Sequence, residues 1–255
     1  MITIKTAEQI KTMQEGGRIL AEILAQLRAM LKIGLEVMTL EDKFIELCKI
    51  NKVIPGCKGY RAAFLPPFNY GLCISINDEA VHCYPKDGTL LRSGDTIAID
   101  TVIKHKGLFV DSAFTEGIGD ISVYDRKFIE TAKYAHNNAL KQAKVGNKIG
   151  AISNQMESIM QLAGFNVLYD FVGHGIGKQM HEEPEIPCFG NRNIGPEIKE
   201  GMTLAIEALV CQGDSEINFP IRGDWETRMA DGKKFAIFEH TVAVTKSEPI
   251  ILTKI

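Results

Sequence analysis

The 255-residue sequence predicts a single α+β domain built from two similar halves. Helix-start signals mark two pairs of helices, and apolar β-like runs follow each pair. A regular βαβ alternation is missing, and residues 173–177 (Gly-His-Gly-Ile-Gly) do not fit the phosphate-binding pattern G-x-G-x-x-G. The sequence shows no low-complexity linker. We therefore expect one continuous domain over residues 1–255.

The first predicted helix pair precedes the first β-like run. Residues 6–9 (Thr-Ala-Glu-Gln) form a capping-box pattern, which begins a helix that runs to about Leu31. Gly16 and Gly17 weaken this helix locally. Residues 39–42 (Thr-Leu-Glu-Asp) give the same start signal, so a second helix is predicted to run to about Ile50.

The second helix pair lies in the middle of the chain. A third helix is predicted to begin between Ser122 and Asp125 and to end near Gly146, and a fourth to run from about Gly150 to Leu162. Apolar runs typical of strands occupy the remaining segments. These runs are Leu72–Ile76, Thr96–Ile103, Gly107–Ala113, Met202–Cys211 and Phe235–Thr245.

Composition excludes several classes of protein. Apolar residues make up 45% and charged residues 24%, and the net charge of −3 gives no general attraction to nucleic acid or anionic membranes. The apolar stretches are far shorter than the ~20 residues that span a bilayer, and no signal peptide is recognisable. Six scattered cysteines without a CxxC pair indicate reduced thiols, with a partial disulfide framework as the less favoured alternative. We expect a cytoplasmic protein.

Four carboxylates interrupt the apolar runs: Asp100, Asp111, Glu207 and Glu239. Burying a carboxylate is costly unless it is paired or bound to a metal. Asp100 and Asp111 flank a polar turn at residues 104–107, so a hairpin would bring them side by side. One such acid alone would more often pair with a lysine or cap a turn. Four together need a common counter-charge, and a metal supplies it.

Histidines give the second indication of a site. His174 lies between glycines, where the main chain can approach a site closely, and His181 follows seven residues later. His82 ends a polar segment after the first β-like run. Asp100, Asp111, His174, Glu207 and Glu239 form an oxygen-rich set suited to two divalent ions, which could be Co, Mn, Fe(II) or Zn. The other histidines are expected outside the site: His105 and His136 on the surface, and His240 on the opposite strand face from Glu239.

Four motifs carry a resemblance to a known family: S-I-N-D-E-A-V-H at residues 75–82, G-H-G-I-G-K-Q-M-H-E-E-P-E-I-P at 173–187, A-I-E at 205–207 and F-E-H-T at 238–241. With the ordered acids, they make the chain resemble the type I methionine aminopeptidases, within the pita-bread metallopeptidases. The resemblance covers nearly the whole chain. It implies a curved, mainly antiparallel sheet with helices on its outer side and halves related by a pseudo-two-fold axis.

The resemblance also implies an activity: metal-dependent removal of the N-terminal (initiator) methionine from nascent proteins or peptides. Asp111 would chelate, and Glu207 would hold metal and move the proton of the attacking water. His82 and His181 would contact the peptide and stabilise the tetrahedral intermediate. The methionine side chain would enter a pocket lined by Cys57, Tyr60, Cys73 and Trp225, for which ordinary core packing is the alternative explanation.

The chain departs from the family pattern at several positions near these motifs. Met180 replaces the usual aromatic residue, residues 64–70 lengthen a loop, and further departures are Cys83, Ala205, Ala208 and Ile237. Two alternatives therefore stay open: a divergent aminopeptidase with another N-terminal preference, and a non-catalytic binding protein on the same fold. The expected partners are the N-terminus of a nascent polypeptide or peptide and, transiently, the ribosome. No specific nucleic acid and no membrane is expected to bind, and a monomer is expected.

Overall fold

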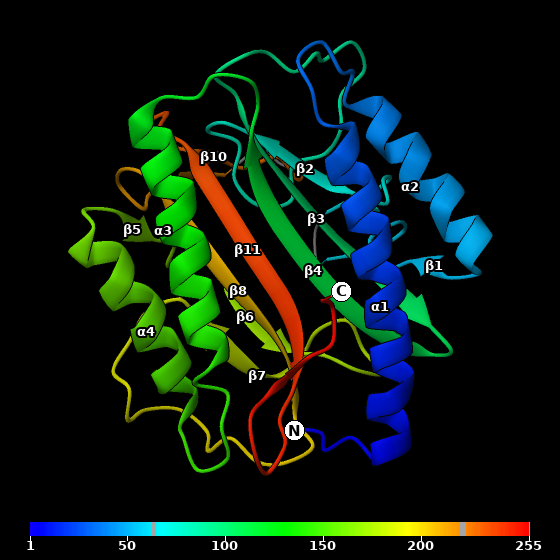
Figure 1. The fold of residues 1–255 in the computed structure, drawn as a ribbon, viewed down its shortest axis with the longest axis vertical. Helices are drawn as coiled ribbons and strands as arrows, with labels where there is room; N and C mark the ends of the chain where they lie inside the picture. The colour runs from blue at the N-terminus through cyan, green and yellow to red at the C-terminus, as the bar shows by residue number, and fades with distance from the viewer. Residues whose placement is uncertain (63–64, 220–222, 255) are drawn as a thin grey trace.

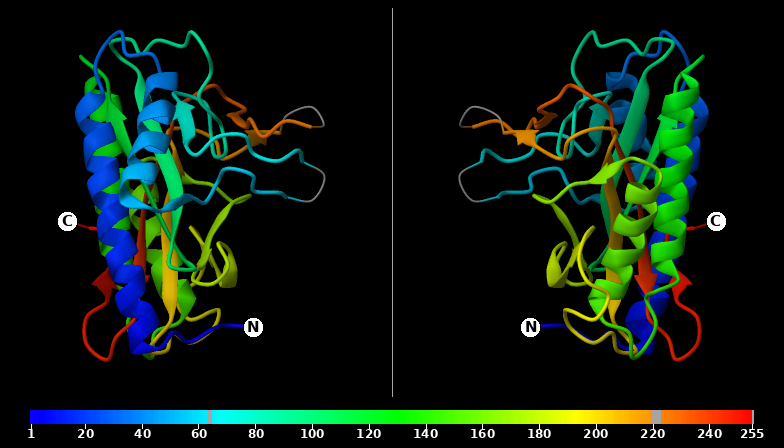
Figure 2. Two further views of the ribbon diagram at one scale, coloured as in Figure 1. Left: turned by 90° about the vertical axis from the view of Figure 1, so that its right-hand side faces the viewer. Right: turned by 90° about the vertical axis from the view of Figure 1, so that its left-hand side faces the viewer.

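A computed structural model describes residues 1–62, 65–219 and 223–254, so Phe64 of the lengthened loop lies outside the described residues. Four helices cover one face of a ten-stranded sheet, as Figures 1 and 2 show. Every strand pairing in these described ranges is antiparallel. The predicted α+β class, with a mainly antiparallel sheet and helices on its outer side, is confirmed.

Each half contributes a helix pair followed by strands. The first half contains α1 (Ala7–Met30), α2 (Met38–Asn51), β1 (Ile54–Pro55), β2 (Cys73–Ile76), β3 (Thr96–His105) and β4 (Leu108–Gly117). The second half contains α3 (Val123–Leu140), α4 (Ile149–Leu162), β5 (Asn166–Val167), β6 (Val172–Gly175), β7 (Glu182–Pro187), β8 (Thr203–Cys211), β11 (Phe235–Ala243) and β12 (Ile250–Ile251). The short strands β9 (Ile217–Asn218) and β10 (Arg228–Met229) form a separate ribbon.

The first helix begins as its capping box predicts. The Thr6 side chain accepts a hydrogen bond from the backbone N–H of Gln9, whose side chain accepts one from the N–H of Thr6. The helix runs unbroken through Gly16 and Gly17. A Cβ at Gly17 would overlap the carbonyl oxygen of Leu252, so only glycine fits at this position. The glycine thus lets the C-terminal segment pack directly against α1.

The second helix agrees with its predicted range within one residue at each end, but its predicted threonine cap is wrong, as is the predicted end of the third helix. The second helix begins at Met38 and not at a Thr39 cap, because the Thr39 hydroxyl donates backwards to the carbonyl of Glu36 at 2.6 Å. The third helix ends at Leu140, six residues before the predicted Gly146. The backbone N–H of Gly146 instead bonds to the carbonyl of Ile198, so the intervening residues form turns that lead into α4.

The two halves meet in the middle of the sheet. The strand order is β1-β3-β4-β11-β8-β6-β7, so that β11 from the second half pairs with β4 from the first (Figure 1). Both helix pairs lie on the same side of this sheet (Figure 2). On the other side, the described loop segments 57–62, 65–70, 213–219 and 223–228 project away from the helices (Figure 2). This helix-free face is where the acids of the central strands gather.

Two histidines predicted to lie on the surface do not. His136 is 2% exposed because it lies on the sheet-facing side of α3, where its Nε2 is 3.0 Å from the carbonyl oxygen of Ile206. The His105 side chain is only 14% exposed, next to α1. His240 packs on the helix side, as predicted, with its Nδ1 2.9 Å from the Thr253 hydroxyl.

All six cysteines are buried and carry free thiols, in agreement with the expected reduced state. Among the described residues, no helix combines the length and the apolar character that a membrane crossing requires.

Candidate metal centre

The five side chains predicted to bind metal come together on the helix-free face of the sheet. Asp100 and Asp111 come from the first half, on β3 and β4, and the other three come from β6, β8 and β11. All five line one cavity of about 290 Å³. The prediction that these five side chains lie together is therefore correct.

A tight turn sets the positions of the two aspartates. Lys106 and Gly107 both have positive φ angles, 47° and 88°, as a two-residue hairpin turn requires. The resulting register pairs Asp100 with Ala113, two residues from Asp111. Because alternate residues of a strand share a face, the two carboxyl groups point to the same side and lie within hydrogen-bonding reach of each other.

The two glutamates lie directly opposite each other. Glu207 on β8 pairs with Glu239 on β11, and Glu239 also pairs with Ala113 on β4. Like charges in such cross-strand positions destabilise a sheet. Thr241 on β11 fixes the backbone of Asp111 on β4. Its hydroxyl accepts a hydrogen bond from the N–H of Asp111 at 2.8 Å and donates one to the Asp111 carbonyl at 2.9 Å. Like-charged groups are thus held together by rigid backbone.

The glycines beside His174 let its strand come close to two others. A Cβ on Gly173 would be 2.6 Å from the carbonyl oxygen of Ala205, and one on Gly175 would overlap the carbonyl of Glu183. The Nδ1 of His174 lies 2.8 Å from the Gly175 carbonyl, which can only accept, so Nδ1 carries the proton. The lone pair of Nε2 is then available, 3.6 Å from Glu207 Oε1 and 3.9 Å from Asp111 Oδ2.

The chemistry of these atoms fits divalent cations. One ligand atom from each of Asp111, His174 and Glu239 can be chosen so that all lie within 4.8 Å of one another. Within the described part of the chain, Asp111 Oδ1 and Glu239 Oε1 are buried and have no hydrogen-bond partner. A buried oxygen without a partner is costly, and coordination to a cation removes that cost.

Electrostatics support the same conclusion. Burial raises the pKa of Asp100 to about 7, and burial followed by the charges of neighbouring acids raises the pKa values of Asp111, Glu207 and Glu239 well above their usual range. Burial, assisted by His181, lowers the pKa of His174 to about 4. The imidazole is therefore neutral, the form that binds metal, and the acids need a positive partner to ionise together.

His82 and His181 lie beside this cluster. The His181 ring packs edge-on against His174 with a centroid distance of 4.4 Å, and its Nδ1 is 2.9 Å from the hydroxyl of Tyr60. His82 adopts a φ of 65°, unusual for a residue with a side chain, and its ring lies between Phe171 at 5.3 Å and Trp225 at 5.9 Å. Both imidazoles line the cavity that contains the acids.

The predicted pocket residues also come together. Cys57, Tyr60, Cys73 and Trp225 belong to one apolar cluster, apart from the main core, on the wall of the same cavity. Sequence reasoning missed Phe68, whose ring contacts that of Trp225 edge-on at 5.4 Å, and Phe171. Their aromatic character was the only available signal, since both lie in loops outside the predicted strands.

Of the five single-residue departures from the family pattern, only Met180 lines the cavity. Cys83 is fully buried, and its thiol donates to the carbonyl of Thr227 at 3.2 Å. Ala205, Ala208 and Ile237 are buried within β8 and β11. Among the described residues, the cavity is thus lined by one single-residue departure, Met180, and by Phe68 of the lengthened loop.

A family model described as "Metallopeptidase family M24" matches residues 11–246. The chain belongs to metallopeptidase family M24. Methionine aminopeptidase 1 of Bacillus subtilis is 36% identical to this M24 chain over 255 residues, which is all of both chains. The crystal structure of methionine aminopeptidase from Thermotoga maritima superposes with a TM-score of 0.95 at 33% identity and covers all of both chains. The resemblance found in the motifs is confirmed.

A further solved structure, at lower sequence identity, has a similar fold. The prolidase of Pyrococcus horikoshii superposes with a TM-score of 0.73 at 20% identity, and this chain covers 63% of it.

Proposed function

We propose that this M24 chain is an aminopeptidase that uses two divalent metal ions to remove the N-terminal (initiator) methionine from nascent polypeptides or peptides. One observation carries the proposal: the acid and histidine cluster opens directly into an apolar cavity lined by aromatic rings and thiols. Full-length similarity to curated methionine aminopeptidases supports it.

Asp100, Asp111, His174, Glu207 and Glu239 would hold the two ions. When bound, divalent ions supply Lewis acidity and a lowered pKa for the attacking water. The oxygen-rich ligand set suits Co, Mn, Fe(II) and Zn, and we propose that any of these ions can occupy the site. The buried, partnerless oxygens of Asp111 and Glu239 support their place in this set.

The apolar cavity would select the first residue of the peptide. A thioether is soft and polarizable, and it packs favourably against aromatic edges and thiols. Trp225 is well placed for this contact because its Nε1–H donates to the carbonyl of Pro66 at 2.9 Å, which fixes the ring. Cys57 and Cys73 lie in the same apolar cluster as Trp225. Tyr60 packs against this cluster, and its hydroxyl contacts His181.

The remaining polar groups would act on the peptide bond. Glu207 would accept a proton from the attacking water and deliver it to the leaving amine. His181 makes its hydrogen bond to Tyr60 through Nδ1, so Nε2 is available to a peptide oxygen. His82, whose ring packs edge-on against Trp225 in the same cavity, would bind the peptide backbone or stabilise the tetrahedral intermediate.

A nascent-chain substrate implies action in the cytoplasm, and the six free thiols agree with a reducing compartment.

A panel of peptides tests the assignment. We expect kcat/KM for Met-Ala-Ser to exceed that for Leu-Ala-Ser by roughly 10–200-fold, because an apolar pocket separates such side chains by only about 1–3 kcal/mol. N-acetyl-Met-Ala-Ser should not be cleaved. Each peptide is assayed with Co, Mn, Fe(II) and Zn. Equal rates for Met-Ala-Ser and Ala-Ala-Ser would favour a divergent aminopeptidase, and absence of hydrolysis by fully metal-loaded protein would favour a binding protein.

A further inference from the structure

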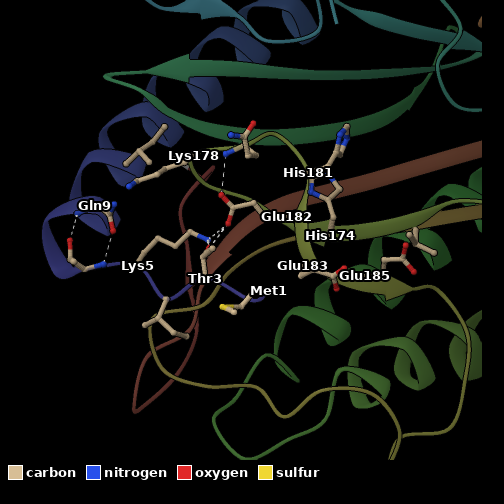
Figure 3. A pocket seen from close by; sticks show the side chains of 15 residues that line it. Met1, Thr3, Lys5, Gln9, His174, Lys178, His181, Glu182, Glu183 and Glu185 are labelled. Atoms are coloured by element: carbon tan, nitrogen blue, oxygen red, sulfur yellow. Dashed lines mark hydrogen bonds and ion pairs between the residues drawn. The ribbon is translucent and has the colours of Figure 1, made fainter. Parts of the chain in front are cut away.

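A buried ion pair links the N-terminal segment to the neighbourhood of the metal centre. The Lys5 ammonium is 2.6 Å from Glu182 Oε2, and the side chains are only 4% and 7% exposed. The backbone N–H of Lys5 donates to the carbonyl of Gly201 at 2.8 Å, which holds the segment in place. Figure 3 shows the pair on the wall of a cavity of about 950 Å³ that also includes His174 and His181.

Several contacts make this pair specific. The Thr3 hydroxyl donates to Glu182 and accepts from the Lys5 ammonium, and Glu182 Oε1 accepts from the backbone N–H of Gln179 at 3.1 Å. A Cβ on Gly177 would overlap Cε of Lys5 and come within 3.0 Å of Glu182 Oε1. Lys5 is thus enclosed between the two ends of the turn at residues 177–182.

This turn carries His181. One end is fixed where the N–H of Phe109 donates to the carbonyl of Gly177 at 2.8 Å, and the other end is fixed by Glu182. His174 precedes the turn; it pairs with Glu185 on β7 on one side and with Ala205 on β8 on the other. Because β8 also holds His174, we expect a change in the turn to displace His181 more than His174.

We propose that Lys5 is a positioning residue for peptide hydrolysis, because its ion pair with Glu182 fixes the turn that places the His181 imidazole beside His174. The inference rests on the proposed function, in which His181 contacts the peptide. Removing one partner of a buried pair leaves an uncompensated charge, so the turn must move to solvate Glu182. A displacement of about 1 Å can reduce a rate by roughly 10²-fold.

Two variants disturb the pair by different routes. Lys5→Met removes the charge, and Gly177→Ala keeps the charge but pushes Lys5 aside. We expect each to lower kcat for a Met-Ala-Ser peptide by about 10–100-fold, with KM and the metal-to-protein ratio close to those of wild type. Lys5→Arg should recover part of the loss. Lys144→Met, which breaks an exposed pair of 2.7 Å with Glu248, is the matched control and should behave as wild type.

Double variants show whether Lys5 acts through His181. In a His181→Ala background, Lys5→Met should cause no further loss of kcat, because the imidazole that it positions is gone. Losses that multiply would overturn the proposal, as would loss of metal from Lys5→Met. If circular dichroism shows that Lys5→Met does not fold, Gly177→Ala replaces it. The kcat of Gly177→Ala in the His181→Ala background is then compared in the same way.

A spectroscopic measurement separates this inference from the proposed function. Two-dimensional NMR of the histidine side chains should show the His181 imidazole signals shifted in Lys5→Met and the His136 signals unchanged. Unshifted His181 signals would overturn the positioning role even if the enzyme is active. An inactive wild-type protein whose His181 signals do shift would contradict the proposed activity alone.

Discussion

At the scale of single residues, the site consists of acids that would repel one another without a cation. Asp111 is central, because its carboxyl group lies near those of Asp100 and Glu239 and near the His174 imidazole. Replacing it by Asn preserves its shape and removes one buried charge. This change separates the electrostatic role of Asp111 from its packing.

Asp111→Asn should bind fewer than two metal ions per chain and lose peptide hydrolysis. The metal-free variant should unfold at a higher temperature than metal-free wild type, because the buried Asn amide, unlike the Asp111 carboxyl group with its raised pKa, takes up no proton on folding. Elemental analysis after purification without chelators measures the first effect, and thermal unfolding in EDTA measures the second. Wild-type metal content in this variant would refute Asp111 as a chelator.

Met180 is the one single-residue departure from the family pattern that lines the cavity. Its side chain is flexible, whereas the methionine aminopeptidases usually carry an aromatic ring there. Met180→Phe should therefore narrow the space for the second residue of the peptide. We expect kcat/KM for Met-Val-Ser, relative to Met-Ala-Ser, to fall about 10-fold, within the range for a methylene-sized clash. Met160→Leu in the α4 core is the control, and an unchanged ratio in Met180→Phe would exclude Met180 from substrate selection.

At the scale of helices and strands, short-range sequence patterns predicted an element correctly where no contact with a distant segment was needed to form it. The Thr6 capping box starts α1, and the apolar runs around them correctly placed Asp100, Asp111, Glu207 and Glu239 in strands. Strands β6 and β7 were missed because glycines and prolines, which normally interrupt strands, occupy them. Contacts between distant segments also left no sequence signal: Lys5 and Glu182 are 177 residues apart.

The buried position of His136 on α3 gives a pH dependence. Burial, assisted by His240, lowers its pKa to about 3, whereas an unfolded histidine titrates near 6.5. Between these values the unfolded chain binds a proton that the folded chain does not. The free energy of unfolding therefore falls as the pH drops from 6.5 toward 3, by at most about 1.4 kcal/mol per pH unit from this group.

His136→Gln should make that dependence shallower, since the amide can still donate to the Ile206 carbonyl but does not titrate. Urea unfolding of both proteins at several pH values between 6.5 and 4 gives the two slopes. Equal slopes would mean that the imidazole is not kept neutral by burial.

At the scale of the whole molecule, metal binding and folding are linked. A ligand at about 100 times its Kd stabilises the folded state by about 2.7 kcal/mol. For a domain of this size that corresponds to roughly 5–10 °C in Tm. Chelation should therefore lower Tm by this amount, and added metal should restore it. His181→Ala should show the same shift as wild type, and a Tm insensitive to EDTA would contradict the metal centre.

The proposed ligand set is divided between the two halves of the chain. Asp100 and Asp111 precede the connection between β4 and α3, whereas the other three proposed ligands follow it. A chain cut at residues 119–121 would yield two fragments, each with an incomplete set. Hydrolysis would return only when β4 and β11 pair again. The two fragments would therefore work as a split-enzyme assay, in which peptide hydrolysis reports their reassembly.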